Sequence, residues 1–280
     1  MWRQMLQTIS VVFVVCTGVA LTNSSSADAS GMTVEKDISY GSDAKQRLDV
    51  YLPEKPNNAP LIVMIHGGAW ASGSKSAKNV VDNKVRHWVP KGYIFVSLDY
   101  RLVPEANPLE QADDVSKALA YVQKMAGTWG GDSQKIVLMG HSSGAHLAAL
   151  MSADPSIVTR QGAKPWLATI ALDSGAYNVS RVMKNRRPAL YEKAFGTDPE
   201  FWRQASPFFR LNGTVPPMLL VCSSLRRVSC NQADAFATKA GNAVEVLPVA
   251  LRHAPINAEL GLDNDYTGNV DRFLNKLGLP

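Results

Sequence analysis

The sequence is poor in cysteine, with three in 280 residues, and it has no cluster of histidines and cysteines at the spacing of metal ligands. A structural zinc site, which needs such a cluster, is therefore not predicted. Cys16 lies in an apolar N-terminal segment, so removal of that segment would leave Cys222 and Cys230. In an exported protein, two cysteines this close in sequence are most simply one disulfide, and a metal-binding pair is the alternative.

The chain also lacks internal repeats, a linker between domains and a basic patch interleaved with aromatics. Hydrophobic residues make up 46% and charged residues 19%, so the chain can bury a sizeable core. The formal net charge is +5, but the basic residues are scattered apart from residues 184–187 and 226–227. This distribution favours a solvated basic surface over a nucleic-acid partner.

The N-terminus has an apolar segment that is too short for a comfortable transmembrane helix. Arg3 precedes it, residues 9–20 form the apolar part, and Ala27-Asp28-Ala29 has the spacing of a cleavage site. We therefore predict a signal peptide over residues 1–29, export to the periplasm or the medium, and no stable membrane span after cleavage. An uncleaved anchor is the alternative.

The remaining residues, 30–280, show apolar runs separated by segments with helical periodicity. Such runs are typical of strands in a mostly parallel sheet covered on both faces, so the predicted fold class is α/β. Strands are predicted near residues 37–40, 46–52, 60–66, 93–101, 135–139, 169–173, 217–222 and 244–248. Helices are predicted at residues 78–89, 109–125, 233–241 and 270–277, with His253 in a loop after the last strand.

Residues 135–150 pass from a short apolar run to small and apolar residues at helical spacing. Between the two halves stands Gly140-His141-Ser142-Ser143-Gly144, which fits G-x-S-x-G. Five residues with three fixed are weak evidence alone. A strand, a sharp turn and a helix in this order are the context of a nucleophile elbow, so Ser142 is the predicted nucleophile.

An acyl-transfer site also needs oxyanion donors and a base. The glycine-rich residues 66–70 follow an early apolar run, and the predicted donors are the N–H groups of Gly68, Ala69 and Ser143. Of the five histidines only His253 follows the last predicted strand, which makes it the predicted base. This chemistry requires no metal or organic cofactor.

These segments, in this order, resemble the α/β-hydrolases of the esterase and lipase group related to hormone-sensitive lipase and the feruloyl-esterase-like carboxylesterases. The resemblance rests on His66-Gly67-Gly68-Ala69-Trp70, Asp99-Tyr100-Arg101-Leu102, Gly140-His141-Ser142-Ser143-Gly144 and the His253 region. It implies an α/β-hydrolase fold and a serine hydrolase that cleaves small-molecule carboxylic esters through an acyl-enzyme. Residues 177–217 are rich in aromatics and longer than an ordinary crossover, so they are expected to form a cap or a pocket wall.

The sequence departs from this family at the third member of the triad. The family places an acid in the loop after the strand at residues 217–222, near positions 227 and 228, where this chain has Arg227 and Val228. The acid orients the histidine and stabilises its protonated form, and its loss can cost on the order of 10⁴ in rate. Another carboxylate could substitute, either Asp173 after the preceding strand or Asp234 in the following helix.

Two other interpretations of the missing acid are a Ser–His dyad and an impaired site. Because the serine, the histidine and the oxyanion turn are all present, substitution or a dyad is favoured over inactivity. The alternatives to an esterase are an amidase, formamidase or peptidase on the same site, and a hydrolase fold retained for binding. Amide cleavage ranks lower because it demands better protonation of the leaving group.

Overall fold

The computed structural model describes residues 25–27 and 31–280. The predicted signal peptide lies outside the described residues except for a short edge strand, β1 (Ser25–Ala27). In the described part of the chain, no helix is long and apolar enough to cross a membrane.

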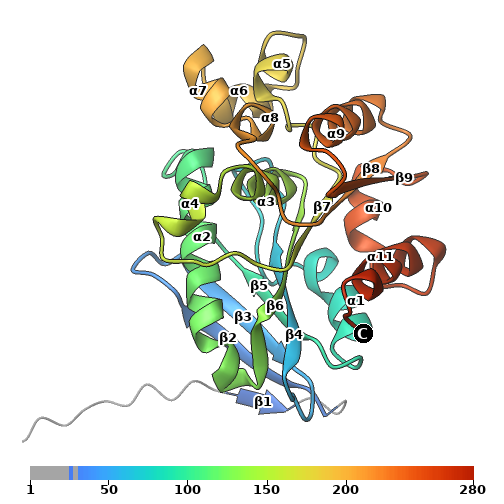
Figure 1. Cartoon of the computed structure of the whole chain (residues 1–280). Coiled ribbons are helices and arrows are strands. Elements are labelled where there is room, and N and C mark those ends of the chain that lie inside the picture. The colour runs from blue at the N-terminus through green and yellow to red at the C-terminus, as the bar shows by residue number, and fades with distance from the viewer. Residues whose placement is uncertain (1–24, 28–30) are drawn as a thin grey trace, which may run out of the picture.

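One nine-stranded sheet organises the molecule (Figure 1), in the order β1-β2-β3-β5-β4-β6-β7-β8-β9. Six strands, from β5 across to β9, run parallel, whereas β1, β2 and β3 pair antiparallel at one edge. This confirms the predicted α/β class. After β1, the strands are β2 (Thr33–Ser39), β3 (Arg47–Leu52), β4 (Ala59–Ile65), β5 (Ile94–Leu98), β6 (Gly131–His141), β7 (Ala168–Leu172), β8 (Met218–Ser223) and β9 (Val244–Val249).

Helices cover both faces of the sheet, and the side chains of β4 show why its sequence is a continuous apolar run. Leu61 and Val63 belong to the core beneath α2 and α3, whereas Ile62 and Met64 belong to the core beneath α1 and α11 (Figure 1). Alternate residues of a strand point to opposite faces, so a strand buried on both sides is apolar throughout. The helices are α1 (Lys78–Trp88), α2 (Pro108–Met125), α3 (Ser143–Ala153), α4 (Pro155–Thr159), α5 (Val179–Met183), α6 (Ala189–Phe195), α7 (Pro199–Gln204), α8 (Pro207–Arg210), α9 (Arg227–Ala240), α10 (His253–Ala258) and α11 (Asp265–Lys276), with a 3-10 turn at Ala126–Trp129.

Three predicted helix boundaries were wrong. Helix α9 begins at Arg227 rather than 233. The prediction missed its first turns because they are polar and show no apolar periodicity. Helix α11 begins at Asp265 rather than 270, where the side chain of Asn264 caps it by accepting a hydrogen bond from the N–H of Thr267. His253 is the first residue of α10 and does not lie in a loop, since a proline is tolerated in a first helical turn.

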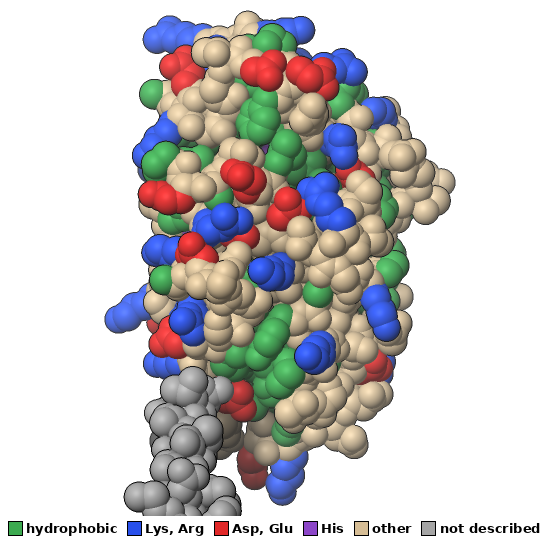
Figure 2. All heavy atoms as spheres, turned by 90° about the vertical axis from the view of Figure 1, so that its left-hand side faces the viewer, with side chains coloured by type: hydrophobic (Ala, Val, Ile, Leu, Met, Phe, Trp, Pro, Cys, Tyr) green, Lys and Arg blue, Asp and Glu red, His purple; other side chains and the backbone are tan. Residues whose placement is uncertain are grey.

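Residues 177–217 form the short helices α5 to α8, which lie at the top of Figure 1, beyond the carboxyl ends of the parallel strands. Ligands of open α/β sheets bind at this edge. On the face shown in Figure 2, Lys and Arg side chains lie among Asp and Glu side chains, so that this face carries charge of both signs.

Candidate active site

Ser142 stands at the sharp turn between β6 and α3, in a backbone conformation that few non-glycine residues adopt. Its φ is +54°, a strained value that costs on the order of 1 kcal/mol or more and that clusters at functional sites. The turn is tightly packed, because a Cβ on Gly144 would lie 2.3 Å from the carbonyl oxygen of Ile65 in the neighbouring strand β4. The absence of a side chain at Gly144 therefore permits the close approach of the elbow to the sheet.

The side chains of Ser142, His253 and Asp173 form a continuous row. Nε2 of His253 lies 3.0 Å from Oγ of Ser142, and Nδ1 of His253 lies 2.6 Å from Oδ2 of Asp173. An ionised carboxylate at that distance requires a proton on Nδ1, so Nε2 is the nitrogen free to accept the serine proton. The three residues come from the ends of β6 and β7 and from the start of α10.

Asp173 is fully buried and follows β7 with a φ of +54°. Burial acts to raise its pKa, but the hydrogen bonds from His253, Ser229 and the N–H of Ser223 outweigh burial. The positive charge of Arg226 acts in the same direction as these bonds. The pKa of Asp173 is therefore held well below its ordinary value, and the carboxylate stays ionised.

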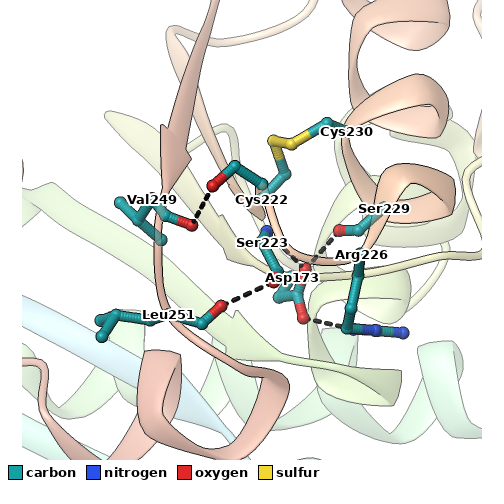
Figure 3. Close-up of a disulfide and its surroundings, with 9 residues drawn as sticks. Asp173, Cys222, Ser223, Arg226, Ser229, Cys230, Val249 and Leu251 are labelled. Atoms are coloured by element: carbon teal, nitrogen blue, oxygen red, sulfur yellow. Dashed lines mark hydrogen bonds and ion pairs between the residues drawn. A yellow bond between two sulfur atoms is a disulfide. The ribbon is translucent and has the colours of Figure 1, made fainter.

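A disulfide between Cys222 and Cys230 joins the end of β8 to the first turns of α9 (Figure 3). The loop that it closes carries Ser223 and Ser229, which both donate to Asp173. Oγ of Ser223 also donates to the carbonyl of Leu251, at 2.6 Å, in the segment that leads to His253. The disulfide thus braces the surroundings of the carboxylate.

Arg226 is a residue of this site that the sequence analysis missed. Its guanidinium donates to Asp173, and Nη1 lies 2.7 Å from Nδ1 of His253. Since Nδ1 carries a proton, the two nitrogens are both donors, and they share one carboxylate oxygen. The signal for it in the sequence was the pair Arg226-Arg227, because a buried carboxylate near this loop needs a cationic partner.

The side chain of His141 contacts the backbone of His253. Burial lowers the pKa of His141 to about 3, so the ring is neutral. Its Nε2 donates to the carbonyl of His253 at 3.0 Å, and the two rings lie 4.6 Å apart. Lys84 of α1 contacts α10, the helix that begins at His253: its Nζ donates to the carbonyl of Asn257 at 2.6 Å. Burial lowers the pKa of Lys84 to about 7.

The turn at residues 66–73 faces the serine. A Cβ on Gly67 would lie 3.0 Å from Cβ of Ser142, and Gly68, Ala69 and Trp70 all have positive φ. In the described part of the chain, the N–H groups of Gly68 and Ala69 donate to no protein acceptor. Ser143 is the first residue of α3, where the N–H groups have no partner within the helix. Among the described residues, these three N–H groups have no hydrogen-bond partner.

The pocket in front of Ser142 has a volume of about 530 Å³. Its lining includes residues 67–70, His253, and Leu190 and Tyr191 of α6. The ring of Trp70 packs against Tyr191 and Phe195, with ring centroids 5.7 Å and 4.7 Å apart. The segment 177–217 therefore contributes part of the pocket wall and is packed onto the glycine-rich turn.

The structure brings together most of the side chains proposed from the sequence. Ser142, His253 and Asp173 are in contact, and the turn that carries Gly68 and Ala69 faces the same pocket. Asp234, the other candidate acid, is exposed on α9, and none of the hydrogen bonds between described residues joins it to His253.

Comparison with solved structures places the fold among esterases. Esterase B from Lactobacillus rhamnosis superposes with a TM-score of 0.71 at 19% identity, covering 89% of this chain and 85% of that one. A truncated carbohydrate esterase from gut microbiota superposes with a TM-score of 0.75 at 20% identity, covering 90% of this chain and 99% of that one. At these identities the likeness concerns the fold.

Sequence comparison gives longer relatives. An isoprenylcysteine alpha-carbonyl methylesterase of Arabidopsis thaliana is 26% identical over 87% of this chain and 61% of its own length. Esterase LipC of Mycobacterium tuberculosis is 28% identical over 67% of this chain and 50% of its own length. This chain thus spans about half the length of the curated relatives it matches.

Residues 48–240, more than half of the chain, match the model of the BD-FAE family. The chain therefore belongs to the BD-FAE family, and its fold is that of an α/β-hydrolase.

Proposed function

We propose that this protein is a serine hydrolase that cleaves carboxylic esters. The observation that carries the proposal is the row of contacts from Ser142 Oγ through His253 to Asp173, at 3.0 Å and 2.6 Å. The positive φ of Ser142 supports it, because backbone strain of this kind is kept at functional sites. The names of the relatives, which include esterases, point to the same reaction class.

In the proposed first step, Oγ of Ser142 attacks the ester carbonyl carbon and its proton passes to Nε2 of His253. Asp173 keeps Nδ1 protonated and stabilises the imidazolium that forms. The carbonyl oxygen becomes an oxyanion, to which the N–H groups of Gly68, Ala69 and Ser143 donate. Fixed donors of this kind need no reorganisation as the charge develops, which lowers the barrier.

Collapse of the tetrahedral intermediate breaks the bond to the alcohol, which takes the proton from Nε2 of His253. An acyl group remains on Oγ of Ser142. Water then enters, gives a proton to Nε2 and attacks the acyl carbon. A second collapse breaks the bond to Oγ of Ser142, which takes the proton from Nε2, and the acid is released.

An organophosphonate probe tests this proposal directly. The probe is expected to form a stoichiometric adduct with the folded protein, located on Ser142 by mass spectrometry of peptides. The Ser142→Ala variant should give no adduct and no turnover of a 4-nitrophenyl ester. A folded protein that is not labelled at Ser142 would overturn the proposal and leave the interpretation as a binding protein.

Amide hydrolysis uses the same groups, and paired substrates separate the two activities. An ester and an amide with the same acyl group differ only in the leaving group, so the ratio of their kcat/KM values measures the preference. We expect the ester to be cleaved faster, because an alcohol leaves more readily than an amine. A ratio near one would assign the protein to the amidases.

We further propose that residues 1–29 are a signal peptide, that residues 30–280 form one hydrolase domain with residues 177–217 as a pocket wall, and that the protein is exported. The disulfide supports export, since such bonds persist in oxidising compartments. Cleavage after residue 29 would also remove β1 and leave β2 at the sheet edge. N-terminal sequencing of protein from the periplasm or medium should begin at residue 30, whereas an intact N-terminus in the cytoplasm would contradict this proposal.

A further inference from the structure

A second cavity, of about 470 Å³, adjoins the active-site pocket. The two cavities share Gly175, Pro188, Tyr191 and Arg226 as lining residues. The other walls of the second cavity come from residues 181–187 and from the first turns of α9. A substrate whose ester group lies at Ser142 can therefore extend past Arg226 into this space.

Four arginines line the second cavity, and no described Asp or Glu is among its lining residues. Two of these groups are balanced by acids outside the lining, since Arg226 pairs with Asp173 and Arg187 lies 3.0 Å from Glu192. The other two side chains form no ion pair with any described residue, which leaves an excess of positive charge. The four are Arg181, Arg186, Arg187 and Arg226.

Arg187 provides a second observation that points to a missing acceptor. Its Nη1 donates to the carbonyl of Met183 at 2.6 Å, and its Nη2 pairs with Glu192. Its Nε is buried and has no hydrogen-bond partner among the described residues. Buried donors in folded proteins nearly always have a partner, so a water molecule or a ligand group is left to accept from this nitrogen.

Asn185, Asn231 and Gln232 line the same cavity. The amide nitrogens of Asn185 and Gln232 already donate to the carbonyls of Arg181 and Asn178, so each has one N–H left as a neutral donor. Guanidinium groups bind carboxylates through paired hydrogen bonds, which favours a planar anion over a neutral polar group. The composition of this wall thus selects an anion.

We propose that the second cavity binds a carboxylate carried by the substrate, so that the preferred esters have an ionised acid group several bonds from the scissile ester. This inference rests on the proposed ester hydrolysis at Ser142 and specifies its substrate class. The carboxylate can belong to the acyl part or to the alcohol part, and the two arms of the experiment below distinguish them.

The experiment compares kcat/KM for anionic and neutral esters of equal size. On the acyl side, mono-4-nitrophenyl esters of adipic, suberic and sebacic acid are compared with 4-nitrophenyl esters of neutral acids of the same length. On the alcohol side, 4-carboxyphenyl butyrate is compared with 4-carbamoylphenyl butyrate. The test variant is Arg181→Gln with Arg186→Gln. The matched control, Lys117→Gln with Arg272→Gln, removes the same charge from α2 and α11, which line neither cavity.

We expect at least one anionic ester to exceed its neutral counterpart by about tenfold in kcat/KM, the order expected for a charge-assisted hydrogen bond. The test variant should bring this ratio close to one, and the control variant should keep it. Preference for the neutral ester in both arms would overturn the inference. An equal fall of the ratio in test and control variants would also overturn it, because net charge alone would then explain the preference.

Equilibrium binding distinguishes a failure of the proposed anion site from a failure of the proposed ester hydrolysis. If no ester is hydrolysed, calorimetric titration with adipate still probes the cavity. Binding to the wild-type protein that weakens by about tenfold in the test variant supports the anion site even when ester hydrolysis is disproved. Absence of adipate binding to the wild-type protein, together with turnover of neutral esters only, overturns the anion site and leaves the proposed function intact.

Discussion

Replacement of Asp173 by asparagine tests the most specific feature of the proposed site. The amide keeps the size of the side chain, and its oxygen can still accept from the N–H of Ser223, which lies 2.9 Å from Oδ1 in the native protein. The amide nitrogen then faces Nδ1 of His253 and donates to it. That contact favours the tautomer with a proton on Nε2, which cannot accept the proton of Ser142.

The expected loss is about 10⁴-fold in kcat, as for the same exchange in a serine protease triad, which corresponds to about 5 kcal/mol of transition-state stabilisation. KM should change little, because Asp173 acts through His253. The assay is steady-state hydrolysis of a 4-nitrophenyl ester, with circular dichroism to confirm folding. A loss of less than about tenfold in a folded variant would refute the role of Asp173 and favour a Ser–His dyad.

Val228→Asp and Arg227→Asp are the matched controls, since they place a carboxylate where the resemblance described above predicts the acid. Both native side chains are exposed, with Val228 53% accessible. Because the contact to His253 is already occupied by Asp173, these variants should change kcat by less than about threefold, within the range of surface substitutions. A large gain in turnover from either variant would show that the native site lacks an effective acid.

Three further predictions concern stability. Gly144→Ala should destabilise the protein by about 1–3 kcal/mol in urea denaturation, because the added Cβ would clash with the backbone of β4. A Cβ added at Gly268 in α11 would have no atom within 4 Å, so Gly268→Ala should stabilise the protein by roughly 0.5–1 kcal/mol. Replacement of Cys222 and Cys230 by serine should cost about 2–3 kcal/mol and lower kcat several-fold, because the loop that holds Asp173 is released; an unchanged kcat would contradict that bracing role. Burial lowers the pKa of Lys84 from 10.5 to about 7, so the unfolded state binds more protons than the folded state between these two pH values. The free energy of unfolding should therefore rise with pH in that range, by up to about 1.4 kcal/mol per pH unit. Lys84→Met should abolish this rise, as measured by denaturation curves at pH 7 and 10.

The sheet was predictable because its strands are buried on both faces. A run such as residues 61–65 has no polar residue, and this pattern does not depend on how the individual side chains pack. The start of α9 was not predictable in this way. Its first turns carry polar residues, and their position depends on the disulfide and on hydrogen bonds to Asp173, which join segments far apart in sequence.

The candidate nucleophile and base could be proposed from sequence because local signals identify them: the glycines that flank Ser142, and the position of His253 after the last strand. Asp173 carried no such signal, since an aspartate at the end of a strand is commonly a turn residue. Its role depends on the direction of its side chain, which follows from a φ of +54°. It also depends on the parallel pairing of β7 with β8, which brings the N–H of Ser223 within reach.

The same contacts explain why the loop after β8 has no acid. Strands β7 and β8 end side by side, so a carboxylate from either could reach His253. In this protein the loop supplies donors instead: the N–H of Ser223, the guanidinium of Arg226 and the hydroxyl of Ser229 all contact Asp173. A second carboxylate that reached His253 from this loop would lie close to one that is already ionised, and repulsion would raise the pKa of one of the two. The exposed side chains of Arg227 and Val228 do not point to such a position. With donors in the segment after β8 and the acceptor at the end of β7, the site avoids that repulsion.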